Sequence, residues 1–323
     1  MSTSSGELTV RITAKTQEAL DICAFELRAV HAPSLPAFSA GSHIDVHIGG
    51  FTRQYSLCND PSENHRYLIA VLKDAKGRGG SAAMHEQLHP GDTIHISVPR
   101  NHFHLASGAR RHLLVAGGIG VTPVLCMAER LAILGADFEM HYCARSPERA
   151  AFRSRIEQSG FASRVCFHFD DGSQEQKLDI PALLQTPEPG VHVYVCGPKG
   201  FMDAVLRSAR ERGWPEDQLH YEFFASDAAA PRQDDGSFSV KLASSGRVIP
   251  VRADQSVSQA LNAAGVGVVT SCEQGVCGTC VTRVLEGIPD HRDMYFTPQE
   301  QAANDQFTPC CSRARTPLLV LDL

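Results

Sequence analysis

Four cysteines in the last sixth of the sequence place the strongest constraint on how this chain folds. Cys272, Cys277 and Cys280 follow the spacing C-x₄-C-x₂-C, and Cys310 lies well downstream. This spacing is typical of plant-type [2Fe–2S] sites, in which four thiolates hold two irons. Three ligands come from one tight loop and the fourth from a distant segment. The pattern therefore predicts a small module built around an iron–sulfur cluster.

Other interpretations of these cysteines stay open. One is a zinc site, although zinc sites favour paired C-x₂-C knuckles and only Cys277 and Cys280 form such a pair. Another is a group of buried free thiols. Cys310 and Cys311 are adjacent, so only one is expected as the ligand, and the spacing from the C-terminal strand favours Cys310. The glycines between the first and third cysteines let the backbone curl toward the cluster and point amides at its sulfides.

The composition restricts the function classes. A length of 323 residues suggests two or three domains. The formal net charge is −6 without a basic run, so nucleic acid is not an expected partner. The N-terminus has no signal pattern, and the longest nearly uncharged stretch, residues 113–128, is too short and too rich in glycine to span a bilayer. Eleven cysteines, an odd number, argue against a disulfide framework, so we expect a cytoplasmic protein with reduced thiols and no membrane partner.

The order of strand and helix patterns predicts a multidomain protein. Residues 1–106 show short alternating strands with turns between them, which predicts an antiparallel β-barrel. Residues 107–225 alternate apolar strands with helices and predict an α/β domain with a parallel sheet. Residues 226–235 have the composition of a linker, and residues 236–323 predict an α+β, β-grasp-like ferredoxin domain. Helices of the α/β domain are expected over 123–134, 147–159 and 200–212.

The turn Gly117-Gly118-Ile-Gly120 lies between a buried strand and a helix and predicts a phosphate site. Its glycines allow a pyrophosphate to come close, and the helix start offers free amides and a positive dipole end. Thr122 is expected to cap the helix, with Pro123 at its first position. The turn does not match G-x-G-x-x-G, and an ordinary βα turn is the alternative.

A second strand–helix turn, Cys196-Gly197-Pro198, is expected at the same edge of the sheet, where open α/β folds bind ligands. Asp170 and Asp171 follow the third strand at that edge. A carboxylate there accepts hydrogen bonds from a ribose hydroxyl and repels a 2′-phosphate, which favours NADH over NADPH. A solvated acidic turn is the alternative for both aspartates.

Two segments of the first domain predict a flavin site. Arg53 is expected to pair with a phosphate, Tyr55 to stack on a planar ring and Ser56 to hydrogen-bond a ring heteroatom. The turn Gly79-Gly80-Ser81 leads into a helix, with Ser81 as the expected N-cap, and offers another phosphate site. A plain barrel strand is the alternative for the first segment alone. Both segments, beside a dinucleotide domain, predict a flavin together with a nicotinamide.

In this order, the motifs resemble the phthalate dioxygenase reductase family, which includes the vanillate demethylase reductases. The resemblance covers nearly the whole chain. It is carried by Arg53-Gln54-Tyr55-Ser56-Leu57, Gly79-Gly80-Ser81, Gly117 to Pro123, Cys196-Gly197-Pro198, the ferredoxin cysteines with Cys310-Cys-Ser-Arg-Ala, and His220-Tyr-Glu-Phe-Phe.

The resemblance implies FMN rather than FAD, and it implies where the cofactors lie. It gives these flavin contacts: Arg53, Gln54, Tyr55, Ser56 and the Gly80-Ser81 turn, with Lys73 nearby. It places Thr122 close to both cofactors, Cys196 near the nicotinamide, and Phe224 over the flavin ring, with Phe223 as the competing choice.

The resemblance further implies an NADH-dependent oxidoreductase of aromatic catabolism, which passes electrons from NADH through FMN and [2Fe–2S] to a Rieske-type oxygenase. A flavin fits this role, because NADH gives two electrons as a hydride while the cluster accepts one. We expect no catalytic side chain, because the chain contributes positioning and electrostatics. Two alternatives remain: a reductase for a cytochrome or another monooxygenase, and a non-enzymatic module that binds zinc and senses a nucleotide.

Overall fold

The computed structural model describes residues 6–75, 77, 79–224 and 235–323. The chain forms two compact units, Met1–Glu222 and Phe223–Leu323. The expected linker lies outside the described residues except for Asp235. The boundary near residue 106 stays a prediction, because both sides of it belong to the first unit. Among the described helices, none has the length and apolar character needed to cross a membrane.

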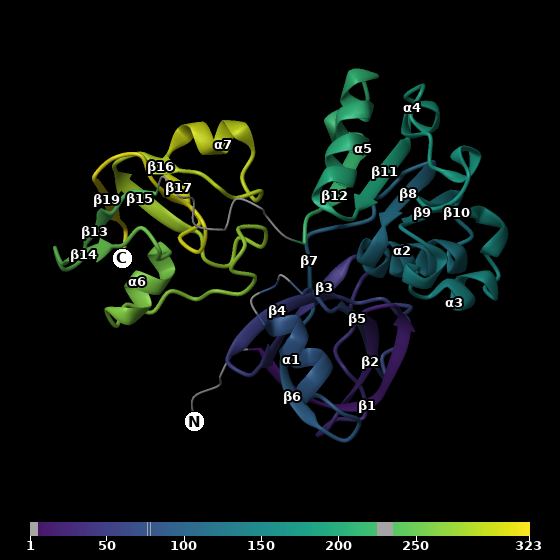
Figure 1. Cartoon of the computed structure of the whole chain (residues 1–323), viewed down its shortest axis with the longest axis horizontal. Helices are drawn as coiled ribbons and strands as arrows, with labels where there is room; N and C mark the ends of the chain where they lie inside the picture. Colours follow the sequence, from purple (N-terminus) through teal and green to yellow (C-terminus); the bar gives the residue numbers. More distant parts are fainter. Residues whose placement is uncertain (1–5, 76, 78, 225–234) are drawn as a thin grey trace. The chain divides into compact units, whose positions relative to one another are not determined.

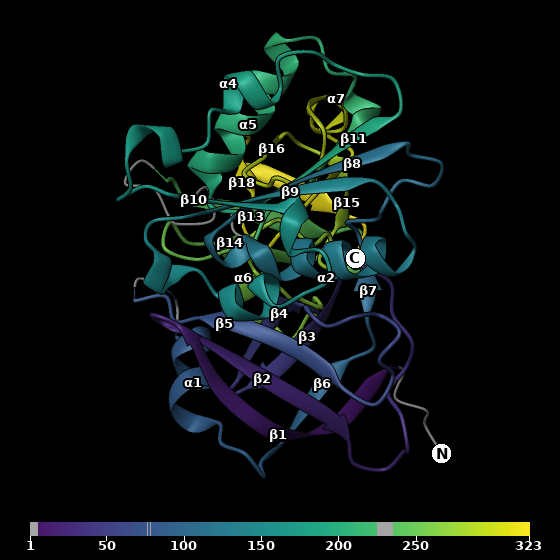
Figure 2. The same cartoon turned by 90° about the vertical axis from the view of Figure 1, so that its right-hand side faces the viewer.

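An antiparallel sheet forms the first half of the first unit, in the order β4-β3-β6-β1-β2-β5, with β7 paired to β3 (Figures 1 and 2). The two ends of this order, β4 and β5, meet through the single bridge between Leu57 and Ile69. The antiparallel domain is therefore confirmed, but among the described residues no ladder closes it into a complete barrel. Its strands are β1 (Glu7–Ala19), β2 (Ile22–Ala29), β3 (Ser42–Ile48), β4 (Phe51–Ser56), β5 (Tyr67–Leu72), β6 (Thr93–Ser97) and β7 (Arg100–Asn101).

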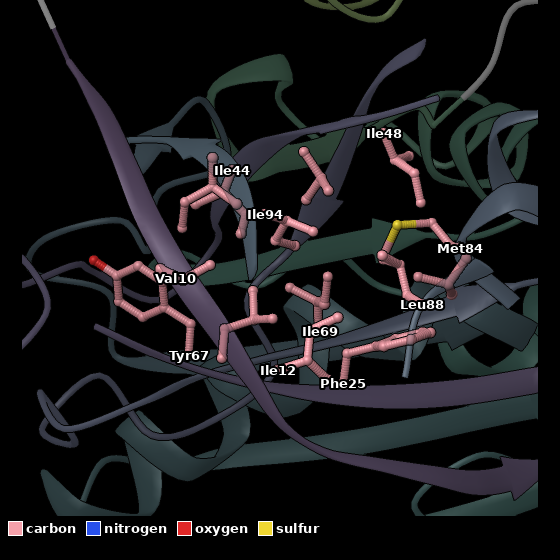
Figure 3. Close-up of a cluster of buried hydrophobic side chains, with 14 of the residues drawn as sticks. Val10, Ile12, Phe25, Ile44, Ile48, Tyr67, Ile69, Met84, Leu88 and Ile94 are labelled. Carbon is pink, nitrogen blue, oxygen red and sulfur yellow. The ribbon is translucent and has the colours of Figure 1, made fainter. Parts of the chain in front are cut away.

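The inward side chains of this sheet alternate along the strands, as expected for a sheet with one buried face. Val10 and Ile12 of β1 pack with Phe25 of β2 and Ile69 of β5, and all four are fully buried (Figure 3). Helix α1 (Gly80–Gln87) adds Met84 to the same core. The helix contacts β3, β4 and β5, so it lies over the place where the ladder stays open.

A parallel sheet forms the second half of the first unit, in the order β10-β9-β8-β11-β12. This confirms the predicted α/β domain. The order reverses between β8 and β11, which makes the carboxyl ends of these two strands the expected place for a ligand. The strands are β8 (Arg111–Gly117), β9 (Phe138–Ala144), β10 (Val165–Phe169), β11 (Val191–Cys196) and β12 (Leu219–Glu222).

Helices cover both faces of the parallel sheet, α2 and α3 on one side and α4 and α5 on the other (Figure 1). The helices are α2 (Val121–Ile133), α3 (Arg153–Glu157), α4 (Ile180–Leu183) and α5 (Lys199–Glu211). The helix expected over 147–159 is interrupted. Pro147–Arg149 forms a 3₁₀ turn, and Phe152, in a left-handed conformation with φ +60°, precedes α3.

The second unit is a mixed sheet in the order β14-β13-β19-β15-β17, in which β13 and β19 are parallel and the other pairs antiparallel. A buried cluster that includes Val240, Val257, Leu261 and Leu319 joins this sheet to α6. This confirms the α+β module. Its elements are β13 (Phe238–Leu242), β14 (Val248–Val251), α6 (Val257–Ala263), β15 (Thr282–Glu286), β16 (Pro289–Asp290), α7 (Pro298–Ala303), β17 (Gln306–Phe307), β18 (Arg313–Ala314) and β19 (Leu318–Leu321).

Gly41, just before β3, packs too tightly for any side chain. Its φ is +91°, and an added Cβ would lie 1.9 Å from the carbonyl oxygen of Phe103. Gly50 has a φ of +79° but open space around it. We expect Gly50→Ala to lower the free energy of unfolding by about 1 kcal/mol through backbone strain. Gly41→Ala should lower it by about 3 kcal/mol, because overpacking adds to the strain.

Urea unfolding followed by the fluorescence of Trp214 measures both losses. Trp214 is the chain's single tryptophan and is buried in the first unit, so its signal reports on that unit. If both variants lost the same free energy of unfolding, the tight packing at Gly41 would not contribute to stability.

Candidate functional site

The cysteine loop lies between α6 and β15 and curls through three residues with positive φ. These are Glu273 (+54°), Gly275 (+71°) and Gly278 (+70°). A Cβ at Gly275 would lie 2.3 Å from the Cys311 sulfur, and a Cβ at Gly278 would lie 2.3 Å from the ring of Tyr295. The loop therefore needs glycine at both positions to follow the path that brings its cysteines together.

The predicted ligand cysteines meet in pairs. The Cys272 and Cys277 sulfurs share a hydrogen bond, which lowers the pKa of Cys277 below its usual value and raises that of Cys272. The Cys310 sulfur likewise contacts the Cys280 sulfur. Of these four cysteines, all except Cys277 are buried from solvent. Two thiol pairs suit a cluster with two irons.

Backbone amides also point at these sulfurs. The N–H of Gln274 donates to the Cys272 sulfur at 3.3 Å, and amides of the loop reach the Cys277 sulfur. Donors of this kind stabilise the negative charge of a thiolate-bound cluster. The residues present therefore fit a [2Fe–2S] group.

Cys310 and Cys311 are equally buried but have different neighbours. The Cys310 sulfur contacts Cys280. The Cys311 sulfur lies 3.2 Å from the Thr308 hydroxyl and 3.8 Å from that of Ser312, besides its contact with Cys310. These contacts support Cys310 as the fourth ligand, which stays a prediction.

Strand β4 and the start of α1 bring two predicted flavin elements together. A Cβ at Gly80 would lie 2.7 Å from the Nε of Arg53, so the guanidinium lies beside the first turn of the helix. A cation next to free helix amides is suited to a phosphate group. The predicted N-cap is wrong, however. The helix begins after Gly79, whose φ is +94°, and Ser81 lies inside the first turn, where its hydroxyl accepts from the amide of Asp74.

The other predicted flavin residues lie around this strand. Tyr55 and Ser56 follow Arg53 on β4, and the Gln54 amide lies 3.3 Å from the Nε2 of His43. Lys73 follows β5 and pairs with Glu86 of α1 at 2.9 Å, so it lies beside the same helix. Their contacts with a flavin stay predictions.

Two residues outside the predicted contacts, Glu222 and His43, join the antiparallel sheet to the parallel sheet. Glu222 ends β12, and one of its carboxylate oxygens accepts from the Ser56 hydroxyl at 3.4 Å. Its other oxygen lies 3.7 Å from the Nδ1 of His43, which is buried and has no hydrogen-bond partner within the described part of the chain. The segment His220-Tyr-Glu-Phe-Phe was the only signal that pointed to Glu222, and none pointed to His43.

The two βα turns lie at the same carboxyl edge of the parallel sheet, as predicted, and they pack against each other. A Cβ at Gly120 would lie 2.2 Å from the carbonyl oxygen of Cys196, and one at Gly197 would lie 3.0 Å from the Cα of Gly117. Gly118 has a φ of +53° and open space around it. Three glycines therefore pack the turns together, while Gly118 leaves the backbone open to a ligand.

The helix caps next to these turns differ partly from those predicted. Helix α2 begins at Val121 with Gly120 as its N-cap, so the predicted capping by Thr122 is wrong. Its hydroxyl donates to the carbonyl of Ile119 at 3.0 Å, because a 3₁₀ turn precedes the helix. Pro198 is the N-cap of α5. Burial, and then the Glu222 charge, raises the pKa of Cys196 well above its usual value, so this thiol is neutral.

The remaining predicted contacts lie at the ends of strands. Asp171 is exposed in the turn after β10, and its amide donates to the carbonyl of Arg145. It lies at the carboxyl edge of the sheet, as predicted. Phe224 belongs to the second unit, so its place over a flavin stays a prediction.

Comparison with known proteins identifies the family. Residues 240–315 match the 2Fe-2S iron-sulfur cluster binding domain, and residues 92–219 match the N-terminal domain of dimethylamine monooxygenase subunit DmmA-like proteins. The chain is 59% identical to a vanillate O-demethylase oxidoreductase of Pseudomonas putida, over 97% of this chain and 98% of the relative. The solved structure of phthalate dioxygenase reductase, titled as a modular structure for electron transfer from pyridine nucleotides to [2Fe-2S], matches with a TM-score of 0.81 and 38% identity over 98% of both chains.

The chain belongs to the phthalate dioxygenase reductase family. It is an NADH-dependent oxidoreductase that carries electrons through a flavin to a [2Fe–2S] cluster for an oxygenase component. This confirms the family, the activity and the cofactor classes expected from the motifs. A further solved structure, an intact type IV self-sufficient cytochrome P450 monooxygenase, matches with a TM-score of 0.80 and 40% identity, over 98% of this chain and 41% of that chain.

Substitution of Cys310 and Cys311 tests which of the two is the fourth cluster ligand. We expect Cys310→Ser to lose the cluster, because it removes a thiolate ligand of the iron, and Cys311→Ser to retain it. Iron per chain and visible absorption measure occupancy, and reduction of a dye by the flavin should persist in both variants. Loss of iron from Cys311→Ser together with its retention in Cys310→Ser would reverse the assignment.

Proposed function

We propose that this chain is the reductase component of a Rieske-type oxygenase system that acts on an aromatic acid or ether, with FMN as its flavin. The observation that carries the proposal is the 59% identity, over nearly the full length of both chains, with a vanillate O-demethylase oxidoreductase. Among aromatic substrates, a methoxy-substituted acid of the vanillate type is the first to test. No two cysteines among the described residues form a disulfide, which supports a cytoplasmic location.

The phosphate site formed by Arg53 and the start of α1 supports FMN. FMN ends in a single phosphate, and a guanidinium beside free helix amides supplies donors for one such group. Tyr55 and Ser56, on the same strand, would then lie along the ring system. The bound flavin supplies the conversion between a transferred hydride and single electrons.

The chain itself contributes by binding the flavin and NADH and by orienting them toward each other. In this proposal the amides of the Gly118 turn would bind the pyrophosphate of NADH, and the buried, neutral thiol of Cys196 would lie near the nicotinamide. Glu222 holds the Ser56 hydroxyl and so fixes the edge where the two sheets meet. Fixing the donor and acceptor sites in one unit lowers the entropic cost of bringing the reactants together.

A cytochrome acceptor is the second candidate. It is favoured by the 40% identity over nearly the whole of this chain with part of a self-sufficient cytochrome P450 monooxygenase. Because this chain covers 41% of that protein, the match concerns only a part of it.

The experiment compares acceptors for the purified reductase. NADH oxidation is measured with the oxygenase component of a vanillate O-demethylase, with a cytochrome P450 and with cytochrome c, and demethylated product is measured in the first case. We expect coupled turnover with the oxygenase component and slower reduction of both cytochromes. Fast reduction of a cytochrome without coupled turnover of the oxygenase component would favour the second candidate.

The position of Asp171 leads to a prediction about the preference for NADH over NADPH. Its exposed carboxylate lies at the edge where a ribose 2′-phosphate of NADPH would approach, so Asp171→Asn should remove a repulsion. We expect the ratio of kcat/KM for NADH over NADPH to fall roughly tenfold, which corresponds to about 1.4 kcal/mol. This ratio is measured by the reduction of a dye by the flavin, a reaction that does not involve the cluster.

Asp170→Asn is the matched control, since it removes an exposed carboxylate from the neighbouring position. An unchanged coenzyme ratio in Asp171→Asn, or an equal change in both variants, would remove Asp171 from its specific role.

A further inference from the structure

A second group of metal-ligating side chains lies in the first unit, on strands β9 and β10. His141 and Cys166 are direct partners in the parallel register. Glu139 precedes His141 by two residues, and His168 follows Cys166 by two, so all four side chains share one face of the sheet. Ligand atoms of Glu139, His141 and Cys166 all lie within 4.8 Å of one another. The activity described above uses none of these residues.

A chain of hydrogen bonds determines which nitrogen of each histidine carries a proton. The backbone carbonyl of Gln176 only accepts, so the Nδ1 of His168, 3.0 Å away, must donate to it. The Nε2 of neutral His168 is then an acceptor, and it takes its hydrogen bond from the Nδ1 of His141 at 2.9 Å. The Nε2 of His141 is left with a lone pair and no proton.

That lone pair faces a carboxylate oxygen. The Nε2 of His141 lies 3.0 Å from the Oε1 of Glu139. Two acceptors at this distance repel each other unless a positive centre lies between them. A second proton on His141 would serve, as an ion pair with Glu139, and a metal cation would serve at the same place. A metal cation satisfies both lone pairs at once.

We propose that Glu139, His141 and Cys166 bind a divalent transition-metal ion, with Zn²⁺ as the best match, and that water completes its coordination. Imidazole nitrogen, carboxylate oxygen and thiolate sulfur are the three ligand types that proteins offer to zinc. Bonds of about 2.0–2.3 Å require the Cys166 sulfur to move toward the other two ligand atoms, whereas the His141 Nε2 and the Glu139 Oε1, 3.0 Å apart, need little change. The exposed side chain of Cys166 has room for this movement.

The surroundings of the three ligands are those of a metal site. His168 accepts from the far nitrogen of His141 and so fixes its tautomer, as outer partners of ligating histidines do. Arg111 binds the other carboxylate oxygen of Glu139 at 2.5 Å, which leaves Oε1 for the ion. The arginine charge opposes that of the ion and limits the affinity. Through His168 and the Gln176 carbonyl, the site connects to the turn that carries Asp171.

Zinc binding to the holoenzyme tests the proposal. The protein, with its iron–sulfur cluster in place, is equilibrated with micromolar zinc chloride, and zinc and iron per chain are measured by elemental analysis. We expect one zinc per chain with no loss of iron. Cys166→Ser and Glu139→Gln should each weaken zinc binding at least tenfold. The matched control is Cys143→Ser, which removes a thiol from the same strand face and should bind as the wild type does.

Alkylation resolved by mass spectrometry locates the ion on the chain. Zinc should slow the reaction of iodoacetamide with Cys166 at least tenfold in the wild type and in Cys143→Ser, but not in Glu139→Gln. The proposal is overturned if wild-type holoenzyme takes up no zinc while its iron is retained. It is also overturned if Cys166→Ser and Glu139→Gln bind zinc as tightly as the control, or if Cys166 reacts equally fast with and without zinc.

Discussion

The close approach of two backbone turns is the constraint on which the nucleotide half of the molecule depends. Gly120 lies against the carbonyl of Cys196, and Gly197 lies against Gly117, so nothing larger than hydrogen fits between the turns after β8 and β11. The strand order reverses between these two strands. The packing therefore shapes the position at which an α/β sheet receives its ligand, and it leaves Gly118 as the exposed part of the turn.

The same edge carries the connection between the two sheets of the first unit. Glu222, at the end of β12, reaches Ser56 and His43 in the antiparallel sheet, so the predicted nicotinamide and flavin edges are built as one structure. The cysteine loop is built separately, in the second unit, by its own glycines and its own core. The two-electron chemistry of the nicotinamide and flavin thus belongs to the first unit, and the one-electron chemistry of the cluster to the second. Each unit is stabilised by its own core.

The sequence predicted the features that depend on local spacing. The cysteine loop, the run of parallel strands and the glycine turns could be found because their signals lie within a few residues of one another. Features that depend on pairing between distant segments could not. The open seam between β4 and β5, the contact of Glu222 with His43 and the cluster around Cys166 all require the sheet register. The capping roles expected of Ser81 and Thr122 were wrong, because a glycine is the N-cap residue of each helix. The helix expected over 147–159 was interrupted because Phe152 takes a left-handed conformation that helical periodicity does not reveal.

The position of β19 has a consequence for how the protein is made. Leu318–Leu321 lies in the interior of the second sheet, between β13 and β15, although it is the last strand of that sheet to be synthesised. While the ribosome is still producing the preceding residues, β13 and β15 have no strand between them, and the core of the second unit lacks Leu319 and Leu321. The first unit has all its strands by residue 222 and is free to fold earlier. Iron–sulfur assembly therefore belongs after synthesis of this strand, when the nascent chain already carries a folded nucleotide half.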